Sequence, residues 1–261
     1  MATTVNMTER FENYKADSHN IWLERFTWNG LHNDSPQNKI SIVNFEKQTH
    51  AFKNMNVMGN AKDFYKEINK LATKYVNWAC TKSIYNDMEK QDLRNFFIGA
   101  IGEYFFTALL QDVNCMLIPN QITNRVERYD FDNVCPRLRK ENDYGIDLTG
   151  MVSVANTYYS CAIQVKFWNP ETDTLITNTI ASGAFTDALL NDFIDIEQGK
   201  NVVVCWLGDT RHVSHYLTDN KKLYKHILFI DKNVLDNSVN DKMPQFWSNL
   251  HIKLQIISVF K

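Results

Sequence analysis

The sequence predicts a mixed α/β fold, in which a mixed β-sheet is flanked by helices. Between residues 63 and 111, apolar residues recur at spacings of three and four, and the pattern then changes to short β-rich runs. The expected order is a helix, three strands, a helix and another strand, which is typical of α/β proteins. With 261 residues, of which 44% are hydrophobic, the chain is long enough to build a full core.

The first 111 residues consist of a segment without a clear pattern followed by two predicted helices. Residues 1 to about 60 are polar, contain scattered aromatic residues and are weakly periodic. The apolar stripe of an amphipathic helix then follows, formed by Phe64, Ile68, Leu71, Tyr75 and Ala79. A second helix over 92–111 is apolar around most of its circumference, so we expect it to be largely buried. We therefore divide the chain into a partly helical N-terminal extension, 1–90, and a main domain, 91–261.

The rest of the chain predicts strands and one more helix. Runs rich in β-branched and aromatic residues indicate strands over 115–118, 146–154, 158–168, 202–207, 226–230 and 252–260. Between the third and fourth strands, 186–197 predicts a helix with Thr186 as its N-cap and Gly199 beyond its end.

Composition excludes several classes of protein. No apolar stretch is long enough to span a membrane, and residues 1–14 lack the apolar core of a secretory signal, so we expect a cytoplasmic protein without a membrane partner. No Gly-rich phosphate loop ending in Lys-Ser/Thr is present, so we expect no nucleotide cofactor. The formal net charge is −2, so any nucleic-acid site must be a local basic patch.

The cysteines and histidines do not form an obvious metal site. The five cysteines are widely spaced and include no C-x-x-C pair, which argues against a disulfide framework and a structural zinc site. Cys161 and Cys205 lie in apolar runs and are interpreted as core residues. His212 and His215 form an H-x-x-H pair without a clear third ligand, so an ordinary loop is the favoured interpretation and a metal site the alternative.

The segment Cys161–Trp168 places polar groups on a strand suited to a sheet interior. Because side chains alternate along a strand, Gln164 and Lys166 share one face while Ile163 and Val165 lie on the other. An unpaired buried ammonium is costly. Lys166 therefore needs an anionic partner, a ligand or a water-filled cleft.

Two acidic residues are candidate partners. If 146–154 and 158–168 form an antiparallel hairpin that pairs Asp147 with Gln164, its turn falls near 155–156, where a loop is predicted independently. Glu103 is the only acidic or basic residue between Arg94 and Asp112, on a helix expected to be buried. Such a lone acid is either paired with a cation or placed to serve a site.

The order of Glu103 on a helix, Asp147 on a strand, Gln164-Val165-Lys166 on the next strand, then a helix and a strand resembles the PD-(D/E)XK nuclease core. The match looks most like the branch containing the methylated-DNA restriction endonucleases, in which Gln commonly replaces the second acid. The resemblance covers about residues 92–207. It implies a restriction endonuclease-like fold for 91–261 and a Mg²⁺-dependent endonuclease, with Mn²⁺ able to substitute.

The resemblance also implies roles for these residues. Asp147, the Gln164 side-chain oxygen and the Val165 carbonyl would be hard oxygen ligands for Mg²⁺. The metal would acidify a water and polarise the phosphate, while Lys166 would orient that water and offset negative charge. Glu103 would bind metal through water or hold a second ion. A neutral Gln164 removes one negative charge from the site, which leaves open whether the site takes one metal or two and whether it is active.

Each residue also has an ordinary structural interpretation. Gln164 and Lys166 suit the exposed face of an edge strand, where Lys discourages strand pairing. Asp147 suits a turn with Gly145. Glu103 suits a structural salt bridge.

Basic residues upstream of Asp147 are candidates for phosphate contact. Arg137, Arg139 and Lys140 follow Arg125 and Arg128, although acidic neighbours dilute the patch and solvated loop charges are the alternative. The leading hypothesis is a restriction or phage-defence enzyme that cuts double-stranded DNA as a homodimer. Residues 1–90 would then serve dimerisation or DNA specificity. The alternative is an inactive nucleic-acid-binding or interaction protein that retains the fold.

Overall fold

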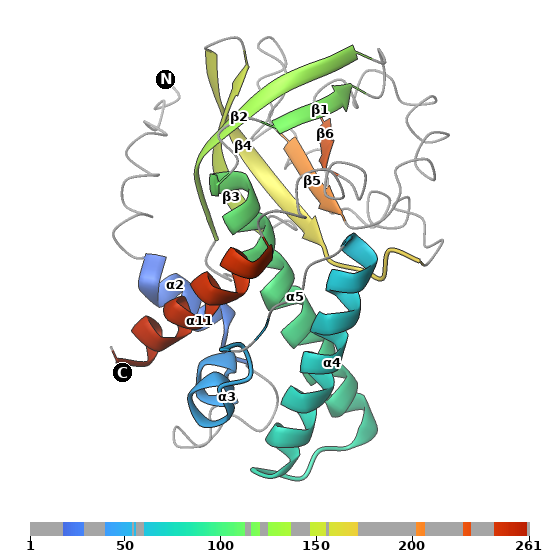
Figure 1. Ribbon diagram of the computed structural model, residues 1–261, viewed down its shortest axis with the longest axis vertical. Helices are drawn as coiled ribbons and strands as arrows, with labels where there is room; N and C mark the ends of the chain where they lie inside the picture. The colour runs from blue at the N-terminus through green and yellow to red at the C-terminus, as the bar shows by residue number, and fades with distance from the viewer. Residues whose placement is uncertain are drawn as a thin grey trace, which may run out of the picture.

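A computed structural model describes residues 18–28, 40–53, 55, 60–112, 116–120, 125–136, 147–154, 157–171, 202–206, 227–230 and 243–259 (Figure 1). The described helices are α2 (Ser18–Arg25), α3 (Ile42–Thr49), α4 (Ala61–Cys80), α5 (Asp87–Asp112) and α11 (Met243–Val259). The described strands are β1 (Met116–Asn120), β2 (Arg125–Pro136), β3 (Leu148–Val154), β4 (Thr157–Lys166), β5 (Val202–Trp206) and β6 (Ile227–Ile230). The predicted mixed α/β class is confirmed.

The described strands form one mixed sheet in the order β1-β2-β3-β4-β5-β6. Neighbouring strands from β1 to β4 are antiparallel, while β5 runs parallel to both β4 and β6. The register of β2 against β3 shifts between Asp132 and Cys135, where Asn133 has a φ of 54°. This irregularity has the features of a β-bulge.

Both helices predicted from periodicity are present. In α4 the five residues of the predicted stripe are all buried, and in α5 Phe97, Ile101 and Phe105 are at most 3% exposed. The helix α5 packs against α4 on one side and against β2 and β4 on the other, so it joins the sheet to the helical layer (Figure 1). It begins at Asp87, five residues before the predicted start, because Asn86 and Glu89 cap its first turn through reciprocal side-chain to backbone hydrogen bonds.

The strand predicted over 252–260 is wrong, because its described residues, 252–259, lie in α11. Alternate apolar residues suggested a strand, but Leu250, Leu254 and Ile257 have helical spacing and are at most 1% exposed. The intervening Ile252 and Ile256 are 51% and 45% exposed. Burial therefore follows the helical period.

Among the described elements, the helices α2 and α3 and the strand β2 were also not predicted. In β2, charged residues such as Asp130 and Asp132 alternate with buried Phe131 and Val134, and this charge density suggested a loop. The short helices α2 and α3 lie in the N-terminal segment that showed little periodicity. The helix predicted over 186–197 lies outside the described residues.

Buried side chains from the N-terminal helices and from the sheet belong to one hydrophobic cluster. Phe45 of α3 contacts Phe97 of α5 edge to face, and Phe64 of α4 contacts Phe167, which follows β4. The cluster therefore includes residues on both sides of the boundary expected at residue 90, and that boundary stays a prediction. Among the described helices, none is long and apolar enough to cross a membrane.

A glycine allows α5 to approach β4 closely. A Cβ atom added to Gly102 would lie 2.4 Å from the Cβ of Phe167, closer than real Cβ contacts permit. Gly102 directly precedes Glu103 in the same helix. The missing side chain thus fixes how near Glu103 lies to the end of β4.

Candidate functional site

The β3–β4 hairpin has the predicted register. Its pairs run from Leu148 opposite Ile163 to Val154 opposite Thr157. One further step along this register brings Asp147 beside Gln164, as predicted. The Asp147 N–H donates a hydrogen bond of 3.0 Å to the Ile163 carbonyl, which holds Asp147 against β4 just before β3 begins.

The carboxylate of Asp147 reaches across to the backbone of β4. Its Oδ2 accepts a hydrogen bond of 2.7 Å from the Val165 N–H. Charge-assisted bonds of this kind are short and strong. Asp147 is therefore held at the Gln164-Val165 peptide, next to the carbonyl and the side chain that the resemblance assigns as further ligands.

The strand β4 carries a buried polar residue. It lies between β3 and β5, which excludes the edge-strand interpretation of Gln164. Gln164 is 2% exposed, and its Oε1 has no hydrogen-bond partner within the described part of the chain. Leaving a buried acceptor unsatisfied costs about 1–3 kcal/mol. Lys166, two residues later on the same face, is the last residue of β4 and is partly exposed.

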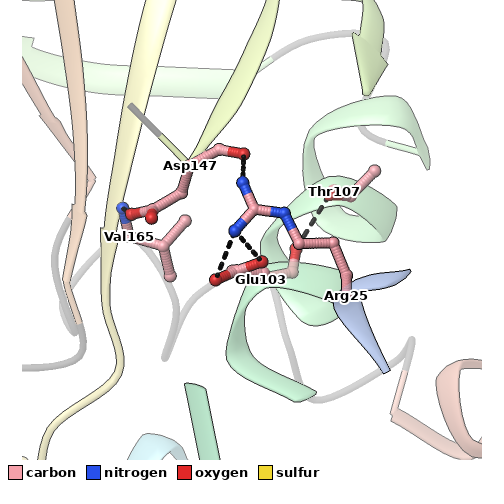
Figure 2. A network of polar contacts seen from close by, with 5 residues as sticks. All are labelled: Arg25, Glu103, Thr107, Asp147 and Val165. Atoms are coloured by element: carbon pink, nitrogen blue, oxygen red, sulfur yellow. Dashed lines mark hydrogen bonds and ion pairs between the residues drawn. The ribbon is translucent and has the colours of Figure 1, made fainter. Parts of the chain in front are cut away.

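Glu103 is paired with Arg25, a residue that sequence analysis missed (Figure 2). Arg25 ends α2 and is 2% exposed. Its Nη1 lies 3.5 Å from Oε1 and 3.4 Å from Oε2 of Glu103, and its Nη2 donates a hydrogen bond of 3.0 Å to the Asp147 carbonyl oxygen. The structure thus brings Glu103 and Asp147 together through Arg25. The Thr107 hydroxyl donates a hydrogen bond of 2.8 Å to the Glu103 main-chain carbonyl.

No short sequence motif identifies Arg25 as a site residue. It is separated by 78 residues from Glu103 and by 122 from Asp147, so no local spacing links them. The only available signal was the charged pair Glu24 and Arg25 between two apolar residues, Leu23 and Phe26. Buried arginine is rare without a partner, but burial itself was not predictable in a weakly periodic segment.

The remaining candidates lie outside the described residues: Arg137, Arg139, Lys140, Gly145, His212 and His215. Within the described ranges, no group of three or more His, Cys, Asp or Glu residues is arranged to hold a metal ion. The predicted ligand set, at Asp147, Gln164 and Val165, contains only one such side chain together with an amide oxygen and a main-chain carbonyl. It is therefore not a group of the kind that this statement covers.

A second buried carboxylate joins α3 to α11. Glu46 is fully buried, and its Oε2 accepts a hydrogen bond of 2.9 Å from the Phe52 N–H. Its Oε1 lies 2.6 Å from Nδ1 of His251. This pair connects the two N- and C-terminal parts of the helical layer and lies apart from the β3–β4 hairpin in sequence and in its contacts.

Comparison with known proteins gives no further assignment: no protein-family model, curated protein or solved structure matches this chain.

Proposed function

We propose that this protein is a Mg²⁺-dependent endonuclease that hydrolyses DNA phosphodiester bonds, with a restriction endonuclease-like arrangement of residues 91–261. The observation that carries the proposal is the hairpin register, which sets Asp147 against the Gln164-Val165 peptide with its carboxylate 2.7 Å from the Val165 N–H. The order of elements also supports it. Glu103 lies on a helix, Asp147 precedes one strand, Gln164 and Lys166 lie on the next, and β5 follows in parallel.

The residues present fit a divalent cation. Gln164 Oε1 is a buried acceptor without a hydrogen-bond partner among the described residues, so a cation would remove an existing cost. Asp147 supplies a carboxylate within reach of the same peptide, and Val165 supplies a main-chain carbonyl. Oxygen ligands of these three kinds suit Mg²⁺, and Mn²⁺ accepts the same ligands.

In this proposal the metal, Asp147 and Lys166 have separate roles in the hydrolysis. A bound Mg²⁺ supplies positive charge for the phosphate and acidity for the attacking water. The hydrogen bond from the Val165 N–H already fixes the orientation of the Asp147 carboxylate, so this group does not have to become ordered when the substrate binds. Lys166 Nζ is a flexible ammonium at the end of β4, which suits holding the water and offsetting charge on the phosphate.

The expected partner is double-stranded DNA, cut by a homodimer whose two sites act on the two strands. Arg137, Arg139 and Lys140 are the residues proposed to contact phosphates upstream of Asp147. Restriction or phage defence is the proposed role.

A non-catalytic nucleic-acid-binding or interaction protein is the second candidate. Two observations favour it: Gln164 lacks the charge of a carboxylate, and Glu103 is engaged by a buried guanidinium. The net charge of −2 points the same way. Retention of Lys166 beside Gln164 favours the enzyme, because an inactive site has no need for an ammonium there.

Cleavage assays with plasmid, phage and single-stranded DNA test the proposal. Wild type, Lys166→Ala and Lys74→Ala are compared with Mg²⁺ and with EDTA; Lys74 is an exposed residue of α4 and serves as the matched control. We expect Mg²⁺-dependent cutting by wild type and Lys74→Ala that is lost in Lys166→Ala. If Lys166→Ala cuts as well as wild type, the role assigned to Lys166 is rejected. If wild type neither cuts DNA nor binds metal, the second candidate is favoured.

A further inference from the structure

The buried guanidinium of Arg25 joins two residues of the candidate metal centre, Glu103 and Asp147. Arginine stays protonated in proteins, so Arg25 brings a permanent positive charge that is 2% exposed. One end of the guanidinium faces Glu103, and the other donates to the main chain of Asp147 (Figure 2). A charge at this depth persists only when it is paired and hydrogen-bonded, and both conditions are met here.

This position matters for how many cations the centre can hold. A metal ion held by Glu103 would have to share the carboxylate with a guanidinium whose Nη1 is 3.4 Å from Oε2 and 3.5 Å from Oε1. Two positive charges that share one buried carboxylate repel strongly. Gln164 also brings no negative charge to offset a second cation. Asp147, by contrast, meets Arg25 through its carbonyl, while its Oδ2 is turned to β4.

We propose that Arg25 is a built-in cation that occupies Glu103, so that the centre takes one divalent ion rather than two. That ion binds at Asp147, Gln164 and the Val165 carbonyl, while Glu103 remains paired with Arg25. Arg25 is thus a positioning residue: it fixes the main chain of Asp147 and removes Glu103 from the ligand set. The inference rests on the proposed function and specifies its metal requirement.

Mn²⁺ titration of the full chain, with bound Mn²⁺ counted by electron paramagnetic resonance, tests this directly. We expect one Mn²⁺ per chain in wild type. Arg25→Met releases Glu103 from its cation, so this variant should take up two. The charge-balanced double variant Arg25→Met/Glu103→Gln should return to one. Arg94→Met is the matched control, because Arg94 is a partly buried arginine that bonds to Asn69 instead, and it should also bind one.

The outcomes separate the inference from the function on which it rests. Two Mn²⁺ per wild-type chain, or one in Arg25→Met, overturns the built-in cation. Loss of all Mn²⁺ in the double variant overturns it too, because the one ion is expected to bind at Asp147, Gln164 and the Val165 carbonyl without Glu103; in each of these cases the metal-dependent function still stands. No Mn²⁺ bound to wild type refutes the metal centre and the inference together. If Arg25→Met does not fold, the wild-type count and the double variant still decide, since neither leaves a buried charge unpaired.

Discussion

The close contact between α5 and β4 can be tested with two glycine substitutions in one helix. A Cβ added at Gly102 meets the Cβ of Phe167 at 2.4 Å, whereas a Cβ added at Gly99 meets nothing within 4 Å. Both glycines lie inside α5, so both alanine substitutions gain about 1 kcal/mol of helix propensity. The two sites therefore differ mainly in the space available.

The contact at Gly102 should reverse the sign of the substitution. The obstructing Cβ is attached directly to the backbone, so it cannot move away as the end of a flexible side chain would. Overpacking of a core costs about 1–3 kcal/mol. A Gly102 Cβ contact this short belongs near the upper end, and subtracting the propensity gain leaves Gly102→Ala destabilised by about 1–2 kcal/mol. Gly99→Ala should be stabilised by about 0.5–1 kcal/mol.

Urea unfolding of wild type and the two variants measures both values. At this chain length, each 1 kcal/mol corresponds to a shift in Tm of about 2–4 °C, so thermal melting provides a second readout. The approach of α5 to β4 is refuted if Gly102→Ala is as stable as Gly99→Ala. A destabilised Gly99→Ala would show instead that position 99 does not accept a side chain, and the comparison would lose its control.

Three further substitutions or labels test other parts of the structure. Gln164→Met replaces a buried amide whose Oε1 has no partner among the described residues with an apolar chain of similar size, so it should raise the free energy of unfolding by about 1 kcal/mol while abolishing Mn²⁺ binding; a destabilised variant that still binds Mn²⁺ contradicts this. Burial raises the pKa of the Cys161 thiol, so its reactive thiolate forms only far above neutral pH. Native protein treated with iodoacetamide between pH 7 and 9 should therefore be modified at exposed Cys80 and not at Cys161, as read by mass spectrometry, and early Cys161 labelling would disprove the core position. His251→Ala leaves the buried Glu46 carboxylate without its Nδ1 partner and should cost about 1–3 kcal/mol in urea unfolding, whereas an unchanged midpoint would show that the pair adds no stability.

The parts of the fold that were predictable are those encoded by local patterns. The stripe of α4 and the register of the β3–β4 hairpin depend on residues close in sequence, and the hairpin follows from a turn of defined position. Local patterns also explain the error at α11, where Leu254 fits both a period of two and a helical period. Only burial against the core distinguishes the two, and burial is a property of the folded chain.

In the candidate site, too, only the contacts between residues close in sequence were predictable. Asp147 and Gln164 come together because their strands are neighbours along the chain, so short-range reasoning was sufficient. Arg25 was not predictable, because its position depends on packing between α2 and elements more than 70 residues away. For Glu103, both proposed interpretations were reasonable from the sequence. The structure supplies the cation, Arg25, and this pairing supports the proposal that Glu103 is kept out of the ligand set.

Asp147→Asn offers the most direct test of the central claim, that Asp147 and Gln164 form a metal-dependent nuclease site. An asparagine Oδ1 can still accept the hydrogen bond from the Val165 N–H, so the hairpin should be kept while the ligand charge is lost. The measurement is scission of double-stranded plasmid DNA in Mg²⁺ by wild type and by this variant. The account predicts that cutting by wild type falls in the variant to the level seen with EDTA. Equal cutting by both proteins in Mg²⁺ would contradict it.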